Sequence, residues 1–312
     1  MQFYAVLTKN LKLASRFCLK VKKAYNVIME IIDGKTIAQE IKQSVRDEVE
    51  KEYILKGKKV PALACVIVEG NKASEVYVAS KQKACTFCNM ESKVVRLPED
   101  VSEEKLFETL DELNEDKDVS GILLQLPLPN GLDSVKATNR ISPTKDVDCL
   151  TFENLGALFS AKKLIAPCTA TGIIKMLKHE NIEISGKRAV VIGRSLLVGK
   201  SVANLLEQEN ATVTICHSRT KNMQEITNQA DILVVAIGKP KYVTEDYVKP
   251  GAVVIDVGIN RTETGLVGDV DFDNVKDKCS FISPVPGGVG PLTVACLMEN
   301  TLLLHKLSHK GE

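Results

Sequence analysis

Four side chains in the first half of the chain have the chemistry to handle a polar substrate and its protons. Tyr77 and Lys81 stand four residues apart in a predicted helix, so they share one of its faces. Gln125 interrupts the apolar run GILLQLPLP, and Asp148 follows in KDVD. A phenol, an amine, an amide and a carboxylate can together orient a substrate and transfer protons. Simpler interpretations exist: Tyr77 and Lys81 as surface residues, and Asp148 as a turn or helix cap.

The position of Gln125 favours a functional role. It lies at the carboxyl end of the predicted strand Gly121–Leu126, and in open α/β sheets this end faces the ligand. A buried amide in such a run also needs hydrogen-bond partners. The Tyr-x-x-x-Lys spacing occurs in short-chain dehydrogenases too, but there it follows the glycine motif. Here it precedes that motif by more than a hundred residues, which argues against a short-chain dehydrogenase.

The segment Gly193-Arg194-Ser195-Leu196-Leu197-Val198-Gly199 predicts a nucleotide site. It lies between a predicted strand and a predicted helix, where a dinucleotide pyrophosphate binds backbone N–H groups at the helix N-terminus. Gly193 allows the tight turn, and Gly199 allows helix and backbone to approach closely. Because the spacing differs from G-x-G-x-x-G, a glycine-containing turn that binds nothing remains the alternative.

The strand after this turn favours NADP over NAD. In NAD-selective sites an Asp or Glu about 20 residues further on binds the ribose 2′-hydroxyl. Here Thr212–Cys216 is followed by His217-Ser218-Arg219, which contains no carboxylate. A hydroxyl and a guanidinium suit a 2′-phosphate, and Arg194 in the turn supplies a second cation.

The elements that must position these residues alternate between strand and helix, which indicates an α/β fold with parallel sheets. Ile37, Ile41, Val45 and Val49 recur every four residues and predict a first helix. The first half continues with strands at Ala62–Val68, Lys93–Leu97 and Gly121–Leu126 and helices at Glu75–Cys88, capped by Ser74, and Glu103–Asn114. The second half has a helix from Thr171, strands at Arg188–Ile192, Thr212–Cys216, Ile232–Ile237 and Val253–Val257, a helix ending near Glu209, and a last helix at Leu292–Lys306.

Length and composition restrict the class of protein. The 312 residues fit about two domains, and a net charge of +1 excludes a large electrostatic footprint for nucleic acid. No apolar run is long enough to cross a bilayer. The nine cysteines are scattered along the chain, which indicates reduced thiols of a cytoplasmic protein. The C-x-x-C at Cys85 and Cys88 has no matching second pair, and the four histidines lack the spacing of metal ligands. No metal is therefore expected. Residues 1–28 contain six Lys/Arg and no acidic residue, and we predict that they form an extension outside the fold.

Considered together, the motifs resemble the bifunctional methylenetetrahydrofolate dehydrogenase/methenyltetrahydrofolate cyclohydrolase family. In chain order they are IDGKTIA, SEVYVASKQKA, GILLQLPLP, KDVD, GRSLLVG, TVTICHSRT, GDVDF and PVPGGVGPLTVA. The resemblance implies two α/β domains around a cleft: residues 29–167 with a returning C-terminal helix (291–312) as the catalytic, folate-binding domain, and residues 168–290 as a Rossmann-type NADP-binding domain. It also implies NADP-dependent oxidation of 5,10-methylenetetrahydrofolate, hydrolysis of the methenyl product to 10-formyltetrahydrofolate, and a homodimer.

The resemblance also implies a role for each candidate residue. Asp148 would accept two hydrogen bonds from the pterin, Tyr77 would pack on the substrate, and Lys81 with Gln125 would assist proton transfer during hydrolysis. The substrate site would further include Ser74 and the loop Pro286-Gly287-Gly288-Val289, which would close over pterin and nicotinamide. The cofactor site would comprise Thr169, Gly193, Arg194, Ser195, Val198, Gly199, Ser218, Arg219, Gly238 and Ile259.

Some residues depart from the family pattern. Cys149 replaces the glycine that usually follows the aspartate, Asn89 replaces the glycine that ends the catalytic helix, and Ala170 and Ser201 replace prolines at helix starts. None of these changes removes a candidate catalytic residue. Two alternatives remain: a dehydrogenase-only relative, against which Lys81 argues, and a non-catalytic nucleotide-binding module, which needs no lysine beside its ligand.

Overall fold

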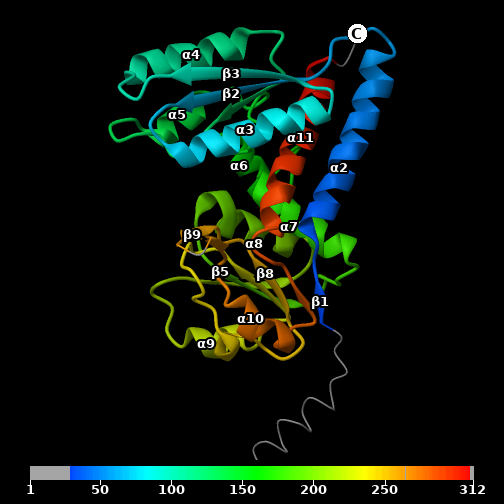
Figure 1. The fold of residues 1–312 in the computed structure, drawn as a ribbon, viewed down its shortest axis with the longest axis vertical. Helices are drawn as coiled ribbons and strands as arrows, with labels where there is room; N and C mark the ends of the chain where they lie inside the picture. The colour runs from blue at the N-terminus through cyan, green and yellow to red at the C-terminus, as the bar shows by residue number, and fades with distance from the viewer. Residues whose placement is uncertain (1–28, 264, 310–312) are drawn as a thin grey trace, which may run out of the picture.

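The computed structural model describes residues 29–263 and 265–309, which form two parallel sheets connected by long helices (Figure 1). The first sheet has the strand order β3 (Glu91–Leu97), β2 (Ala62–Val68), β4 (Gly121–Leu124). The second has the order β1 (Glu30–Ile31), β11 (Phe281–Ile282), β8 (Val253–Asp256), β7 (Ile232–Val235), β5 (Arg188–Ile192), β6 (Thr212–Cys216). Every neighbouring pair in both sheets is parallel, so the predicted fold class is confirmed. The predicted extension, residues 1–28, lies outside the described residues.

Strand β2 is the centre of the first sheet, and its seven residues are all buried. Leu63, Cys65 and Ile67 face a core shared with α3 (Lys72–Phe87), whereas the alternate residues face a core shared with α4 (Glu103–Glu115). Burial on both faces explains the continuous apolar run of this strand. A short helix, α5 (Ser134–Arg140), adds to the α4 side through Ala137.

Two long helices connect the cores of the two sheets, as their parallel course in Figure 1 shows. The first half of α2 (Gly34–Val49) contributes Ile37 and Ala38 to the core of the second sheet, and its second half contributes Val45 and Val49 to that of the first. The last helix, α11 (Val289–Ser308), does the same, with Leu292 in one core and residues from Cys296 onward in the other. Both helices therefore link the two sheets through buried side chains.

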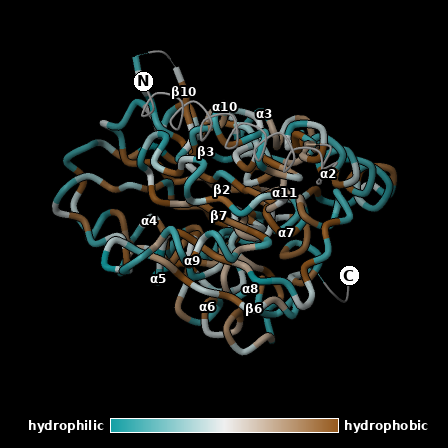
Figure 2. Tube along the Cα trace, turned by 90° about the horizontal axis from the view of Figure 1, so that it is seen from below, coloured by the Kyte–Doolittle hydropathy of each residue, from teal (hydrophilic) through white to brown (hydrophobic). Residues whose placement is uncertain are grey.

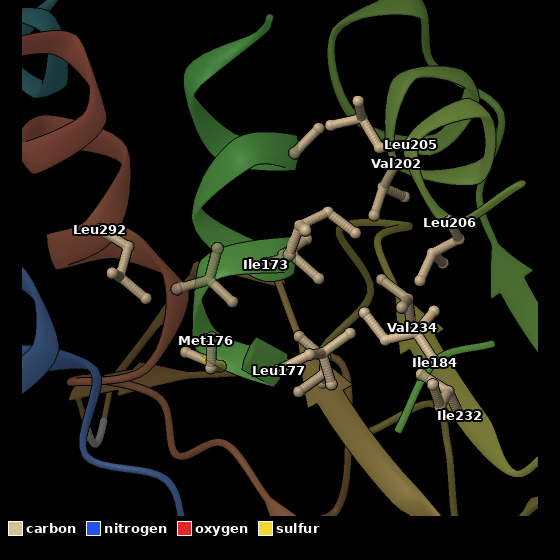
Figure 3. Packing of buried hydrophobic residues seen from close by; sticks show 14 of the residues in the cluster. Ile173, Met176, Leu177, Ile184, Val202, Leu205, Leu206, Ile232, Val234 and Leu292 are labelled. Atoms are coloured by element: carbon tan, nitrogen blue, oxygen red, sulfur yellow. The ribbon is translucent and has the colours of Figure 1, made fainter. Parts of the chain in front are cut away.

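The second sheet packs against α7 (Cys168–His179) and α8 (Ser201–Gln208) on one face (Figure 3). Ile173 and Leu177 of α7 meet Leu206 of α8 above Val234 of β7. Hydrophobic residues, brown in Figure 2, concentrate along the central strands, and hydrophilic residues, teal, along the outer loops. The remaining helices are short: α6 (Phe152–Phe159), α9 (Met223–Thr227) and α10 (Phe272–Val275), with single turns at Glu50–Ile54, Leu196–Lys200, Glu245–Tyr247 and Lys276–Lys278.

The structure corrects several predicted boundaries. Helix α3 begins at Lys72, so Ser74 lies inside it and is not its cap; the Ser74 backbone N–H instead donates to Asn71 Oδ1 at 3.2 Å. Strand β1 was not predicted, and it pairs with β11 of the second sheet although it begins the segment assigned to the first domain. The antiparallel hairpin of β9 (Asn260–Thr262) and β10 (Gly265–Val267) was not predicted either.

Two of the noted departures occupy left-handed backbone conformations. Asn89 has a φ of 57°, which asparagine adopts more readily than most residues. Cys149 has the same φ, and its side chain is buried. The turn after Asp148 is therefore kept in this chain, with the strain of a non-glycine residue in it. Within the described ranges, 29–263 and 265–309, no helix is long and apolar enough to cross a membrane.

His305 of α11 is a buried histidine at the amino end of the first sheet. Its Nδ1 lies 2.8 Å from Ser120 Oγ, and its ring packs edge-on against Tyr53 at 4.9 Å between centroids. Burial lowers the pKa of His305 to about 4, and neighbouring His309 adds to this effect. The unfolded chain therefore gains a proton below about pH 6.5 that the folded chain accepts only near pH 4.

We predict that this histidine makes the protein less stable as the pH falls from about 6.5 to 4. The loss in the free energy of unfolding is on the order of 3 kcal/mol at most, because each pKa unit corresponds to about 1.4 kcal/mol. Urea unfolding of wild type and His305→Gln across this range measures it: the variant should be less stable at pH 7 and should lose less stability with acid. Equal slopes for the two proteins would contradict the prediction.

Candidate active site

Helix α3 and strand β4 bring Lys81 and Gln125 together. Lys81 Nζ donates to Gln125 Oε1 at 2.8 Å. Gln125 directly follows β4, where its backbone N–H donates to Val66 O of β2 at 2.9 Å. Its side-chain Nε2 donates to Leu126 O at 2.6 Å, so the amide is oriented with its oxygen towards the lysine. Because the backbone and both amide atoms of Gln125 are held, the position of the Lys81 ammonium is defined.

Tyr77 lies one helical turn before Lys81 on α3. It is 42% exposed, on a helix that packs against the first sheet through the buried Val78, Ala84 and Cys85. Ser74, one turn further back, is buried. The structure therefore offers the Tyr77 ring as a surface beside Lys81, whereas Ser74 exposes only 3% of its surface.

Asp148 is positioned by the carboxylate of Asp146. Asp146 bridges to Ile122 of β4, and its side chain accepts the backbone N–H groups of Leu150 and Thr151 at 2.9 and 2.8 Å. Asn154 Nδ2 donates to it at 3.0 Å. The turn-forming role that was one interpretation of Asp148 is therefore carried by Asp146, two residues earlier.

Burial raises the pKa of Asp148, while the nearby Lys81 ammonium and a hydrogen bond with Cys168 oppose the rise. Cys168 is fixed in turn by Asn300 of α11, whose Nδ2 lies 3.5 Å from the sulfur and 2.9 Å from Val147 O. Lys81, Gln125 and Asp148, which come from three separated segments, therefore form one electrostatic cluster.

The turn between β5 and α8 has the close backbone packing that a dinucleotide site requires. Gly193 has a φ of +130°, and a Cβ there would lie 2.2 Å from Ala236 O. A Cβ on Gly199 would lie 2.4 Å from Gly193 O. Ser195, predicted to bind cofactor, has its Oγ 3.3 Å from the backbone N–H groups of both Val198 and Gly199, so it caps the following turn.

A hollow of about 270 Å³ lies beside this turn. Three of the residues that the sequence predicts to bind cofactor, Gly193, Arg194 and Ser218, line it. Further lining residues, to which the sequence pattern assigns no role, come from α9 and from the segments after β6 and β7: His217, Met223, Ala236, Ile237, Lys239 and Tyr242. The Ser218 hydroxyl and the Arg194 guanidinium, beside a turn that has no side chain at Gly193, suit a dinucleotide with an additional phosphate.

Several predicted cofactor residues lie elsewhere. Arg219 is exposed and does not line the hollow; its backbone N–H donates to His217 Nδ1 at 3.2 Å. Thr169 Oγ1 lies 3.1 Å from Thr293 Oγ1, between α7 and α11. Gly238 sits between two lining residues without being one, and Val198 belongs to the turn after Ser195.

A second hollow, of about 170 Å³, brings Ile259 together with the predicted loop. Pro286, Gly287, Gly288 and Val289 all line it, and the Val285–Pro286 peptide bond is cis. Lys35 and Asp256 line it as well, neither of which was predicted. Among residues 29–263 and 265–309, no three His, Cys, Asp or Glu side chains gather as metal ligands.

These features define a two-domain α/β enzyme with a dinucleotide site in its second domain: two parallel sheets, the glycine turn after β5, and the cluster of Lys81, Gln125 and Asp148. Two family descriptions match the chain: tetrahydrofolate dehydrogenase/cyclohydrolase, catalytic domain, over residues 32–148, and the NAD(P)-binding domain of the same enzymes over residues 167–309. The chain belongs to the tetrahydrofolate dehydrogenase/cyclohydrolase family.

Individual relatives support this assignment over nearly their whole length. The bifunctional protein FolD of Listeria innocua is 54% identical over 274 residues, which cover 88% of this chain and 96% of the relative. The crystal structure of the bifunctional FolD of Campylobacter jejuni has a TM-score of 0.87 at 42% identity, covering 89% of this chain and 99% of that one. The FolD structure of Trypanosoma brucei, complexed with NADP and an inhibitor, has a TM-score of 0.86 at 40% identity and covers 90% and 98%.

Proposed function

We propose that this chain oxidises 5,10-methylenetetrahydrofolate with NADP and hydrolyses the methenyl product to 10-formyltetrahydrofolate, both at the Lys81 cluster. The observation that carries the proposal is the 2.8 Å contact between Lys81 Nζ and Gln125 Oε1 beside Asp148. The family supplies the two reactions and their place in one-carbon metabolism. The contact favours a bifunctional enzyme over a dehydrogenase-only relative or a binding module, because neither needs a fixed amine at this point.

In the first reaction the protein acts mainly by positioning. Asp148 accepts two neighbouring N–H groups of the pterin, and the exposed ring of Tyr77 packs on the substrate. NADP held beside the glycine turn by Gly193, Arg194 and Ser218 would supply the acceptor for the hydride of the bridging methylene. Orientation of the reacting carbons is sufficient for such a transfer, so this step needs no acid or base from the protein.

In the second reaction a water molecule adds to the cationic methenyl carbon and must lose a proton. The neutral form of the Lys81 amine is the group placed to accept it, and Gln125 holds this amine at the substrate. Collapse of the hydrated intermediate opens the ring by breaking a C–N bond, and the departing nitrogen needs a proton. The Lys81 ammonium formed when water adds donates this proton. The amine then takes the hydroxyl proton as the C=O bond of the formyl group forms, and this is the net proton that hydrolysis releases.

Cofactor selection follows from the hollow beside the glycine turn. Arg194 and Ser218 line it, and no Asp or Glu follows β6 at the position that would bind a free 2′-hydroxyl. Gly193 and Gly199 support the pyrophosphate, and the loop Pro286–Val289 would cover the nicotinamide with Ile259. The NADP complex of the Trypanosoma brucei relative supports this choice.

We further propose the predicted domain division, with folate bound by residues 29–167 and 291–312 and cofactor by residues 168–290. A cytoplasmic homodimer completes the proposal. Strand β6 lies at one edge of the second sheet, and its Ile215 side chain is 39% exposed, so this edge is available to a second copy. Light scattering on the full chain tests the dimer, because it would give twice the chain mass.

Replacement of Lys81 tests the assignment of the hydrolytic step. In Lys81→Ala, hydrolysis of methenyltetrahydrofolate should fall by about 100-fold or more, the usual size of a general acid–base contribution. Reduction of NADP with methylenetetrahydrofolate should fall less, because that step depends on positioning. Lys83→Ala is the matched control, since Lys83 is an exposed lysine on the same helix. Hydrolysis by Lys81→Ala within about twofold of wild type would refute the role.

Replacement of Arg194 tests the cofactor choice. Loss of a charged hydrogen bond costs about 1.5–3 kcal/mol, so Arg194→Ala should raise the KM for NADP roughly 10- to 150-fold. The KM for NAD should stay within about twofold, because NAD has no 2′-phosphate. Lys221→Ala removes an exposed cation from the same region and should change neither value. A parallel rise in both KM values for Arg194→Ala would contradict a 2′-phosphate contact.

A further inference from the structure

Two buried carboxylates lie between the cofactor hollow and the Pro286–Val289 loop. Asp256 ends β8 and is 3% exposed; Asp269 follows β10 and is fully buried. The proposed reactions use neither residue. Since burial of a carboxylate is costly unless hydrogen bonds compensate it, the partners of this pair identify what it does.

The Asp269 carboxylate accepts hydrogen bonds from the backbone of the segment after β7. Its Oδ2 accepts the N–H groups of Ile237 and Gly238 at 2.7 and 2.9 Å, and its Oδ1 accepts that of Lys239 at 2.8 Å. Asn260 Nδ2 adds a fourth donor at 2.9 Å. Three successive N–H groups on one carboxylate define the path of this segment closely, and two of its residues, Ile237 and Lys239, line the cofactor hollow.

Asp256 fixes Asp269 in turn. Its Oδ1 accepts the N–H groups of Gly258 and Asp269 at 3.0 and 2.9 Å, and its Oδ2 accepts that of Val270 at 2.9 Å. Burial raises the pKa of Asp256 to about 6, and the negative charge of Asp269 adds to the rise. At neutral pH the pair is held mainly by neutral N–H donors, which are directional and therefore fix geometry.

Two glycines lie so close to these carboxylates that neither position has room for a side chain. A Cβ on Gly258 would lie 2.3 Å from the carboxyl carbon of Asp269, and a Cβ on Gly268 would lie 1.8 Å from Asp256 Oδ2. The loops after β7, β8 and β10 therefore meet around the pair with no room for another side chain. Asp256 and Gly258 also line the second hollow, next to the Pro286–Val289 loop.

We propose that Asp269, fixed by Asp256, is a positioning residue for the dinucleotide: it holds the segment Ile237–Lys239 as one wall of the cofactor hollow and keeps it in register with the loop at Ile259. Neither carboxylate touches the folate cluster at Lys81, which belongs to the other sheet. The inference rests on the proposed function, because it predicts that the pair serves the NADP-dependent reaction and not the hydrolysis.

Asp269→Asn is the variant that tests this role. An asparagine has one acceptor oxygen, and its amide NH₂ would face N–H donors, so at least one contact to Ile237–Lys239 is lost without a change of size. The KM for NADP should rise about tenfold or more. Hydrolysis of methenyltetrahydrofolate, assayed without nucleotide, should stay within about twofold of wild type. Asp273→Asn is the matched control, since its side chain is 77% exposed, and it should leave both values unchanged.

Other outcomes overturn the inference. An unchanged KM for NADP in folded Asp269→Asn would do so, and so would a parallel fall of both reactions at constant KM, which a merely structural role produces. If the variant does not fold, Asn260→Ser removes only the Asn260 side-chain donor and should raise the KM for NADP about two- to fivefold with hydrolysis intact; an unchanged KM overturns the inference there too. A wild-type protein that lacks one of the two reactions would instead contradict the proposed function.

Discussion

The contact between Lys81 and Gln125 is the constraint on which the first half of the structure depends. It requires helix α3 to lie at a fixed distance from β2 and β4. This distance is set by the packing of α3 on β2, whose residues are all buried. It also requires an amide whose orientation cannot reverse, which the bonds of Gln125 to Val66 O and Leu126 O provide. Asp146 then fixes the turn from which Asp148 reaches the same place. An amine, an amide and a carboxylate from three segments thus become one site.

In the second half of the chain the site is formed mainly by backbone groups, because a dinucleotide is recognised largely through the backbone. Glycines at 193 and 199 bring main chain close to main chain, and Asp269 arranges successive N–H groups into one wall of the hollow. The two halves are coupled through α2 and α11, whose buried side chains belong to both cores. Because these helices are long and have buried side chains in both cores, the spacing between the Lys81 cluster and the glycine turn is set by the helices rather than by loops.

Much of this arrangement could be predicted from the sequence. The strands Ala62–Val68, Arg188–Ile192 and Thr212–Cys216 have the predicted bounds, because apolar runs between turn residues are a strong signal. Strands β1 and β11 have two residues each and carry no such signal. Ser74 was misassigned as a cap because Asn71, three residues earlier, competes for that role. Asp256 and Asp269 had no predicted role, since their partners are backbone N–H groups of distant loops, which no side-chain pattern reveals; the GDVDF motif was the only hint.

The central claim is that Lys81, held by the Gln125 amide, transfers the proton in hydrolysis. The most direct test is the pH dependence of methenyltetrahydrofolate hydrolysis in wild type and Gln125→Glu. A carboxylate 2.8 Å from the amine favours its charged form, so the neutral amine that accepts a proton forms only at higher pH. The account predicts that the rising part of the rate profile moves upward by about one pH unit or more. An unchanged profile, with the variant folded and active, would contradict it.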